Sequence, residues 1–219
     1  MERVIQLGLI DDQNLFREGM KLVLNTFPEL NVLLEATSGP HLLEQLKEVQ
    51  PDVLLLDYTM PEMDGYEVLK AVNASYPTVK VIMLSMHFDE SLMAYLMQNG
   101  ANGYLLKDEQ SNTVKEAIVT VMKAGQYFPD YVSKALLKQL QIQAPTNVKK
   151  SPRLKKDSFS TREKEILNLI GKYSRQEMAN QLFISIKTID FHLKNLRDKT
   201  ESTSTAELVR YAIKYGFQE

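Results

Sequence analysis

Residues 51–61 read PDVLLLDYTMP and are followed by Asp64-Gly65. The apolar run that ends at Asp57 is short and uninterrupted, which is typical of a strand buried on both faces of a sheet. Proline and glycine then stop the strand. The run therefore predicts a carboxylate, Asp57, at the carboxyl end of a buried strand.

Three other apolar runs also end in polar side chains: residues 7–12 read LGLIDD, residues 79–85 read VKVIMLS and residues 103–107 read GYLLK. Together the four runs supply a cluster of carboxylates, a hydroxyl group and an ammonium group. Phosphoryl transfer requires a positioned nucleophile and neutralised charge. The set therefore predicts a magnesium-dependent acceptor of a phosphoryl group.

The first 125 residues alternate apolar strands with amphipathic helices. Five such units predict an α/β fold, a doubly wound five-stranded parallel sheet of the flavodoxin-like kind with helices on both faces. Ligands bind such sheets outside the carboxyl ends of the strands, where the polar residues above fall. We expect strands at 4–10, 31–36, 52–56, 80–84 and 102–106, and helices at 13–25, 40–49, 64–75, 88–98 and 111–124.

After Ala124-Gly125 the chain changes character. Residues 144–152 are polar and include prolines, which indicates a flexible hinge. We therefore expect three parts. They are a phosphoacceptor domain at 1–125, a linker at 126–156 with one helix at about 131–142, and a small all-α domain of four helices at 157–219.

Helix starts after Phe159 are marked by capping boxes, in which a serine hydroxyl and a glutamate satisfy free amides of the first turn. Ser185 marks a fourth start. Four short helices, with the second and third joined by residues 182–185, predict a helix-turn-helix layout. The boxes pair Ser160 with Glu163, Ser174 with Glu177 and Ser204 with Glu207.

Composition excludes several classes of protein. The 219 residues are 44% hydrophobic and 25% charged, which are ordinary values for globular domains. The absence of cysteine excludes disulfides and thiolate metal sites. No apolar run approaches the ~20 residues of a membrane span, and no signal peptide is visible, so we expect a cytoplasmic protein with no membrane partner.

The net charge of −2 hides an asymmetry. Residues 1–148 carry 11 Lys/Arg and 19 Asp/Glu, a net charge of −8. Residues 149–219 carry 15 Lys/Arg and 9 Asp/Glu, a net charge of +6. The basic half is therefore the part expected to meet phosphates.

The acids at the strand ends suit a metal-assisted reaction. Asp57 is the expected nucleophile. We expect Asp12, Asp57 and the backbone carbonyl of Thr59 to hold Mg²⁺ through oxygen, with Asp11 positioning the ion through water. Acids at strand ends also occur as solvated loop residues or helix caps, and Asp64 is expected to be such a cap.

The other two strand ends suit the phosphoryl group itself. Lys107 is expected to pair with the phosphoryl oxygens, and Ser85 to donate a hydrogen bond to them. A lone Lys107 would be an ordinary surface lysine. The functional interpretation is favoured because all four strand ends converge in this topology.

These residues resemble the receiver domain of bacterial two-component response regulators, over about residues 4–124. The resemblance implies that Asp57 takes its phosphate from a sensor histidine kinase. It also implies that Ser85 and Tyr104 form a switch pair, in which the tyrosine ring turns inward; the alternative is that Tyr104 is a half-buried strand aromatic. Many receivers have a cis proline after the lysine, whereas Asp108 follows here.

The segment from Phe159 to Phe217 resembles the LuxR-type helix-turn-helix DNA-binding domain. The resemblance implies a recognition helix from about Ile186 to Lys199, which would read promoter DNA in the major groove. The residues that carry it are Ser160, Thr161, Arg162, Glu163, Ile166, Leu167, Glu177, Met178, Ala179, Leu182, Ser185, Ile186, Lys187, Thr188, Ile189, His192, Lys199, Glu207 and Leu208.

The recognition helix has a core face and an exposed face. Ile189, Leu193 and Leu196 are spaced to face the core. His192 is expected to pack or to face a phosphate. On the exposed face we expect Asp190, Phe191 and Lys194 near bases, and Lys187, Thr188, Asn195 and Lys199 near phosphates. Asp190 is unusual where relatives often have a basic residue, but an acid can accept from cytosine N4.

Two departures from the LuxR pattern concern the last helix. Residues 200–202 replace an apolar run, and Thr205 stands where an arginine is frequent. They keep open the alternative that the C-terminal domain docks a protein through a solvated basic face. That domain would then belong to a phospho-regulated adaptor that does not bind DNA.

We interpret the chain as a DNA-binding transcriptional response regulator that forms homodimers when Asp57 is phosphorylated. The expected helices 88–98, with Met93, Leu96 and Met97, and 111–124 are candidate dimerisation faces; core packing is the alternative. A magnesium-dependent phosphohydrolase would need a second acid two residues after its nucleophile, where this chain has Thr59. We therefore expect no enzyme beyond slow hydrolysis of the chain's own aspartyl phosphate.

Overall fold

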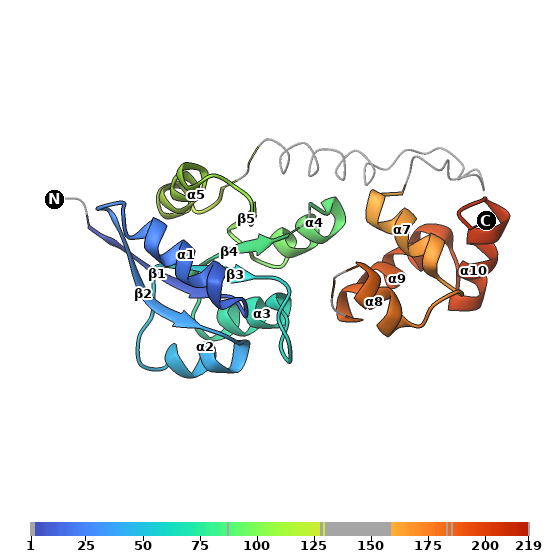
Figure 1. The fold of residues 1–219 in the computed structure, drawn as a ribbon, viewed down its shortest axis with the longest axis horizontal. Helices are drawn as coiled ribbons and strands as arrows, with labels where there is room; N and C mark the ends of the chain where they lie inside the picture. The colour runs from blue at the N-terminus through green and yellow to red at the C-terminus, as the bar shows by residue number, and fades with distance from the viewer. Residues whose placement is uncertain are drawn as a thin grey trace. The chain divides into compact units, whose positions relative to one another are not determined.

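The computed structural model describes residues 3–86, 88–127, 129, 159–182, 184 and 186–218. The chain divides into two compact units, Met1–Gln143 and Ala144–Glu219, each of which is described by itself (Figure 1). The helix expected at about 131–142 and the helix start expected at Ser185 lie outside the described residues.

The N-terminal unit is built on a five-stranded parallel sheet in the order β2-β1-β3-β4-β5. This order places β3 in the middle, and all of its residues are buried. The predicted doubly wound α/β sheet is therefore confirmed. The strands are β1 (Ile5–Ile10), β2 (Leu30–Ala36), β3 (Val53–Asp57), β4 (Lys80–Ser85) and β5 (Gly103–Leu106).

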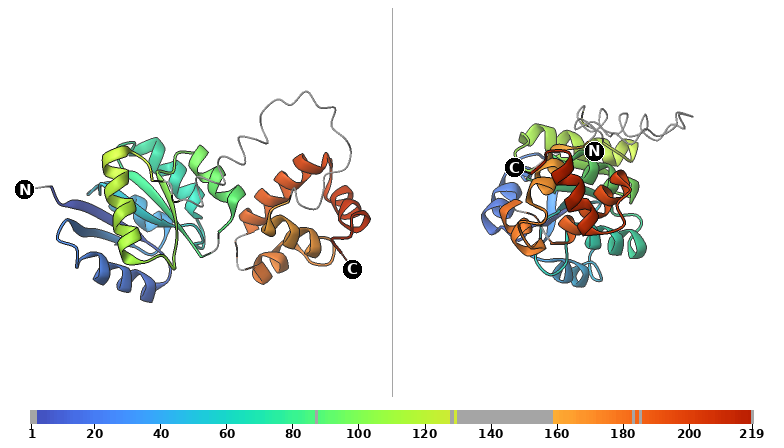
Figure 2. Two further views of the ribbon diagram at one scale, coloured as in Figure 1. Left: turned by 90° about the horizontal axis from the view of Figure 1, so that it is seen from above. Right: turned by 90° about the vertical axis from the view of Figure 1, so that its right-hand side faces the viewer.

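Helices cover both faces of this sheet. Leu9 and Leu55 belong to a core that also contains Ile118 of α5 and Leu24 of α1. Figure 2 shows α5 lying along the sheet, and Figure 1 shows α2 and α3 on the other side. The helices are α1 (Asn14–Leu24), α2 (Gly39–Gln45), α3 (Gly65–Ser75), α4 (Glu90–Gln98) and α5 (Ser111–Ala124).

The second helix is shorter than expected. It ends at Gln45, whereas the sequence predicted an end near residue 49. The amides of Lys47 and Glu48 donate to carbonyls three residues earlier, so the chain tightens into turns. The other nine described elements of this unit agree with the predicted bounds to within two residues.

The turn between β3 and α3 fixes the position of Asp57. Asp64 caps α3 as predicted, in a reciprocal box with Glu67 at 3.0 and 3.2 Å. The Gly65 amide donates to the Tyr58 carbonyl at 2.9 Å. A Cβ atom on Gly65 would lie 2.5 Å from the Asp57 carbonyl oxygen, so the helix start approaches the strand as closely as only glycine allows.

Helix α4 does not offer the dimerisation face that we expected from Met93 and Leu96. Both side chains are fully buried, and Met97 is half-buried. The apolar residues of α4 are therefore spaced to pack against the core of their own unit. On α5, by contrast, Met122 is 38% exposed.

The described part of the C-terminal unit is all-helical, as predicted. One core joins its helices, with Ile166, Met178, Ile189 and Leu208 among its buried members. No helix among the described residues combines the length and apolar character needed to cross a bilayer. The helices are α7 (Thr161–Leu169), α8 (Arg175–Leu182), α9 (Ile186–Thr200) and α10 (Thr205–Lys214).

Two of the three predicted capping boxes are confirmed, and the third is half wrong. The Ser160 and Ser174 boxes are reciprocal. At α10, Ser204 accepts from the Glu207 amide at 3.2 Å, but the Glu207 carboxylate binds the amide and hydroxyl of Thr203 at 2.7 and 2.8 Å. Two donors from Thr203 outcompete the single Ser204 amide, and these bonds hold the pKa of Glu207 below its usual value.

Gly65→Ala should destabilise the N-terminal unit by about 1–3 kcal/mol, because the new methyl group meets backbone atoms that cannot rotate away. The midpoint of urea unfolding, followed by circular dichroism, measures the change. Gly19→Ala in α1 is the matched control: nothing lies within 4 Å of its Cβ position, so it should stabilise by about 0.5–1 kcal/mol. Equal midpoints for Gly65→Ala and wild type would contradict the packing described here.

Candidate functional site

The carboxyl ends of four strands meet at one edge of the sheet. Asp11 and Asp12 follow β1, Asp57 ends β3, Ser85 ends β4 and Lys107 follows β5. The Lys107 amide donates to the Ser85 carbonyl at 2.8 Å, which continues the pairing of β4 and β5 beyond the strands. The structure thus brings together the residues that the sequence placed at the strand ends.

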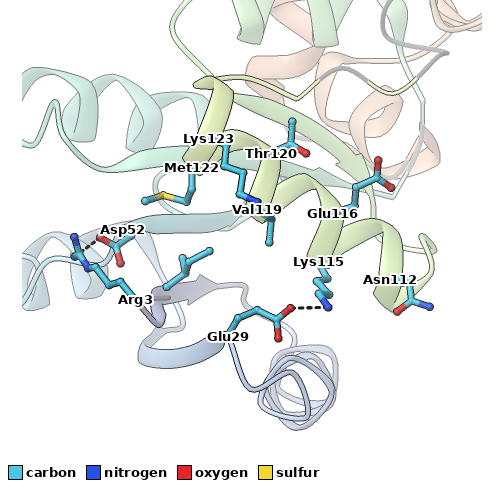
Figure 3. A pocket seen from close by; sticks show the side chains of 11 residues that line it. Arg3, Glu29, Asp52, Asn112, Lys115, Glu116, Val119, Thr120, Met122 and Lys123 are labelled. Carbon is cyan, nitrogen blue, oxygen red and sulfur yellow. Dashed lines mark hydrogen bonds and ion pairs between the residues drawn. The ribbon is translucent and has the colours of Figure 1, made fainter. Parts of the chain in front are cut away.

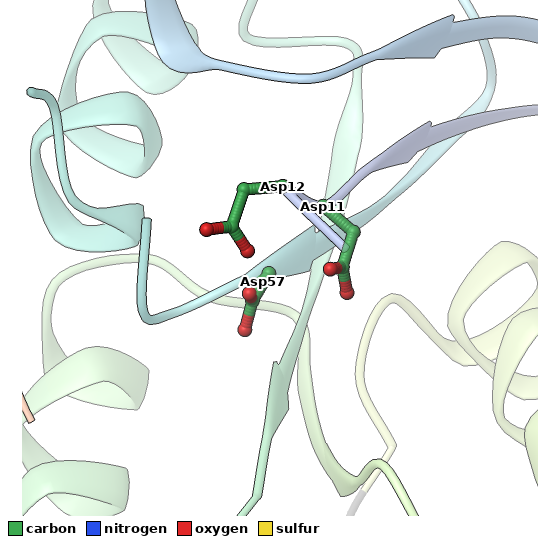
Figure 4. A group of neighbouring side chains, drawn as sticks. All are labelled: Asp11, Asp12 and Asp57. Atoms are coloured by element: carbon green, nitrogen blue, oxygen red, sulfur yellow. The ribbon is translucent and has the colours of Figure 1, made fainter. Parts of the chain in front are cut away.

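Three carboxylates gather at this edge (Figure 4). Asp11, Asp12 and Asp57 offer oxygens that all lie within 4.8 Å of one another. Asp11 and Asp57 are buried, whereas Asp12 is exposed. One oxygen of Asp11 accepts from the Gln13 amide at 2.9 Å, and one oxygen of Asp57 accepts from the Thr59 amide at 3.2 Å. Backbone amides therefore orient both buried carboxylates.

The ammonium group of Lys107 lies between the two buried acids. Its Nζ is 2.7 Å from Asp11 Oδ2 and 2.9 Å from Asp57 Oδ2, and the side chain is almost completely buried. The ring of Phe16 lies against the same nitrogen, with its centroid 4.8 Å away. Lys107 is therefore held by charge on one side and by an aromatic face on another.

The site raises the pKa of Asp57 to about 7. Burial is the main cause, and the negative charge of Asp11 adds to it. Lys107 and the Thr59 amide act in the opposite direction, but they do not outweigh burial. Two buried carboxylates thus share one ammonium group, and the local balance of charge favours a further cation.

The donor set fits Mg²⁺. Asp11, Asp12 and Asp57 supply only oxygen, the ligand type that this hard cation prefers. The backbone carbonyl of Thr59 accepts no hydrogen bond from the described residues, so its oxygen is available as well. These are the four groups that the sequence predicted for the ion.

Ser85 and Tyr104 are directly linked. The Tyr104 ring is fully buried and Ser85 is 8% exposed. Burial raises the pKa of Tyr104, against the effect of hydrogen bonds to the Ser85 side chain and the Asp89 backbone. The ring is therefore inward in this structure, rather than half-buried. The peptide bond between Lys107 and Asp108 is trans, like all those described.

Helix α9 shows the two faces expected of a recognition helix. Ile189, Leu193 and Leu196 are buried in the core. On the other face Lys187, Asp190 and Lys194 are exposed, and Phe191 and Asn195 are half-buried.

Two residues of α9 belong to the core instead of the surface. Thr188, which we expected to contact a phosphate, is 1% exposed, so its side chain does not reach a docked duplex from this conformation. His192 is fully buried, and its ring meets Phe191 edge-on at 5.2 Å. Packing is therefore the role of His192.

Lys199 has a structural partner that the sequence did not suggest. Its ammonium group lies 2.8 Å from each carboxylate oxygen of Glu163, which is fully buried at the start of α7. Glu163 also closes the capping box on the Ser160 amide at 2.9 Å. One glutamate therefore caps α7 and holds the end of α9.

Comparisons with known proteins agree with both halves of the structure. Residues 7–119 match the response regulator receiver domain, and residues 157–212 match the bacterial regulatory proteins of the luxR family. The chain belongs to the LuxR family of response regulators. Its two domains make it a DNA-binding transcriptional regulator of a two-component system.

Relatives of this response regulator align along its whole length. Transcriptional regulatory protein DegU of Brevibacillus brevis is 33% identical, over 99% of this chain and 96% of its own. Oxygen regulatory protein NreC of Staphylococcus epidermidis is 31% identical, over 96% and 97%. The solved structure of ChrA, a response regulator of a heme-sensing two-component system, is 27% identical and covers 98% of each chain with a TM-score of 0.52.

Sequence reasoning missed a residue that fixes the acids of this response regulator. The Arg17 guanidinium donates to the Asp11 carbonyl and to the Asn14 side chain, both at 2.8 Å. It also lies 3.7 Å from Glu35 of β2, and its side chain is only 11% exposed. The position of Arg17 one helical turn into α1 was the available signal, since an inward arginine there can reach back to the strand end.

A groove of about 690 Å³ lies elsewhere on the receiver domain, beside α5 (Figure 3). Arg3 and Asp52, which precede β1 and β3, form an ion pair in its wall at 2.7 Å. Lys115 and Glu29 form a second pair at 2.6 Å. The groove is at the amino ends of the strands, so it is separate from the acid cluster.

Lys199→Met should destabilise the C-terminal unit by about 1–3 kcal/mol, because it leaves the Glu163 carboxylate buried without its cation. Thermal unfolding followed by circular dichroism measures the loss. Lys194→Met makes the same chemical change on the exposed face of α9 and should leave stability nearly unchanged. The assignment fails if the two variants unfold at the same temperature.

Proposed function

We propose that Asp57 accepts a phosphoryl group from a sensor histidine kinase, with Mg²⁺ held by Asp11, Asp12, Asp57 and the Thr59 carbonyl. A carboxylate oxygen of Asp57 attacks phosphorus while the bond from phosphorus to the donor breaks. The bound ion would neutralise charge on the phosphoryl oxygens. The observation that carries the proposal is the meeting of three carboxylates and one buried ammonium group at a single sheet edge.

The neighbouring groups have complementary roles in this proposal. Lys107 turns toward the phosphoryl oxygens. Once Asp57 is phosphorylated, Asp11 is the one remaining carboxylate beside Lys107, and the phosphoryl dianion attracts the ammonium group more strongly than that carboxylate does. Ser85 donates its hydroxyl to a phosphoryl oxygen in place of its hydrogen bond with Tyr104, whose ring is already inward, so the serine reports phosphorylation to the strand β5. Thr59 offers no carboxylate to activate water, so hydrolysis of the aspartyl phosphate on this chain is slow.

Asp57→Ala should abolish labelling of the full-length chain by acetyl phosphate in the presence of Mg²⁺, because Asp57 is the proposed nucleophile, whereas Asp11, the other buried acid in contact with Lys107, is proposed to hold the ion. Phosphate-affinity electrophoresis separates the two forms. Asp108→Asn is the matched control, since it removes one exposed carboxylate next to the site and should label like wild type. Labelling of Asp57→Ala at the wild-type level would mean that another residue is the acceptor.

We also propose that helix α9 enters the major groove of promoter DNA. Lys194, Asp190 and Phe191 lie on its exposed face and are the proposed base contacts. Lys187 and Asn195 are the proposed phosphate contacts, together with Lys199, whose side chain remains 39% exposed beside Glu163. Thr188 is excluded by its burial.

The division of labour follows from these assignments. We propose a receiver domain at 1–125, a linker at 126–156 and a DNA-binding domain at 157–219, acting in the cytoplasm where promoter DNA lies. Phosphorylation of Asp57 shifts the receiver between two states and favours homodimers that bind a two-part site. The exposed side of α5, which includes Met122, is one candidate surface for such a contact, whereas Met93 and Leu96 of α4 are buried.

Lys194→Ala should weaken binding to the preferred promoter duplex by about 1–3 kcal/mol, because the lysine is exposed in the middle of the recognition helix. Fluorescence anisotropy at several salt concentrations measures both affinity and its salt dependence. Lys214→Ala, at the end of α10, makes the same change of charge away from α9 and should bind like wild type. Unchanged affinity for Lys194→Ala removes this residue from the interface.

A further inference from the structure

Helix α9 carries an acid, Asp190, near the start of its basic face, and a second, Asp198, near its end. Asp190 lies three residues after Lys187 and four residues before Lys194, so all three side chains share one side of the helix. A carboxylate there opposes binding to DNA phosphates, which dominate affinity. We therefore expect a cation that neutralises the Asp190 carboxylate and a base that could donate a hydrogen bond to it.

The structure supplies the partner. Arg175, the first residue of α8, places Nη1 3.1 Å from Asp190 Oδ1. The side chains are 55% and 47% exposed, and an ion pair in such an exposed position contributes little to the stability of a fold. Stability of the fold therefore does not account for the pair.

Both members retain unused hydrogen-bonding capacity at the surface. Among the described residues, the second oxygen of Asp190 has no partner, and the guanidinium of Arg175 has no other acceptor. A guanidinium carries five donors and can bind a carboxylate and a phosphate together. The pair thus combines one acceptor for a base edge with several donors for a phosphate.

We infer that Arg175 is a positioning residue that makes Asp190 specific for cytosine. The inference rests on the proposed docking of α9 in the major groove. Arg175 spans from the Asp190 carboxylate to a backbone phosphate, and the second oxygen of Asp190 accepts a hydrogen bond from cytosine N4. The carboxylate suits this base because the cytosine amino group is a donor in the major groove, whereas guanine and thymine present acceptors there and adenine sets the N7 acceptor beside its N6 donor.

The experiment uses the full-length chain and a pool of duplexes with a randomised core. Bound duplexes are selected and sequenced for wild type, Asp190→Asn, Arg175→Lys and Arg175→Ala. Affinities are then measured on two duplexes that differ only by C·G or T·A at the position that Asp190 reads. Asp198→Asn removes an exposed acid from the same helix, and Arg210→Ala removes an exposed arginine from α10; both serve as matched controls.

Wild type and both controls should prefer cytosine at one position of the site by about 5- to 150-fold. Asp190→Asn should lose that preference and shift toward adenine, because an amide pairs with adenine through two hydrogen bonds. Arg175→Lys should keep the salt dependence yet lose most of the cytosine preference, since lysine keeps the charge without the planar fork. Arg175→Ala should lose the preference and lower the slope of log affinity against log salt by about 0.9.

Two negative results have separate meanings. If wild type binds and selects a sequence, and either Asp190→Asn or both Arg175 variants keep its base preference, the inference about Arg175 is overturned while the proposed docking stands. If wild type binds no duplex even at low salt, the docking is overturned and the inference with it. Circular dichroism of each variant confirms that these surface changes leave the fold intact.

Discussion

The receiver domain depends on one buried ammonium group set between two carboxylates. Lys107 lies within 2.9 Å of both Asp11 and Asp57, in a place from which water is almost completely excluded. A buried ion pair of this kind is costly to assemble and more costly to break, because a lone buried charge has no compensation. Two residues support this arrangement. Phe16 packs on the ammonium group, and Arg17 holds the strand end that bears Asp11.

Most of the receiver fold and its acid cluster could be predicted from the sequence. Strand ends such as Asp57 and Lys107 were predictable because apolar runs of strand length stop at polar residues, and parallel strands end at the same edge. The support from Arg17 was not predictable, since it depends on a side chain that turns back toward the strand. The predicted phosphate contact of Thr188 was wrong for a related reason. The spacing of residues along a helix does not distinguish a small polar residue at the edge of the core from one at the surface.

Local competition decided the other differences. The sequence around Ser204 has the spacing of a capping box, yet Thr203 offers an amide and a hydroxyl to the same glutamate and prevails. The apolar spacing of Met93 and Leu96 suits a core and an interface equally well, and only burial separates the two. Patterns predict which elements form, whereas the choice among nearby partners is made by three-dimensional packing.

Helix α9 is tied near its beginning and at its end to different helices. Asp190 pairs with α8 through Arg175, and Lys199 pairs with α7 through Glu163. The pair with the fully buried Glu163 restrains the end of α9, so less conformational freedom is lost there when the helix docks. A restrained helix then discriminates between operators partly by the shape of their grooves.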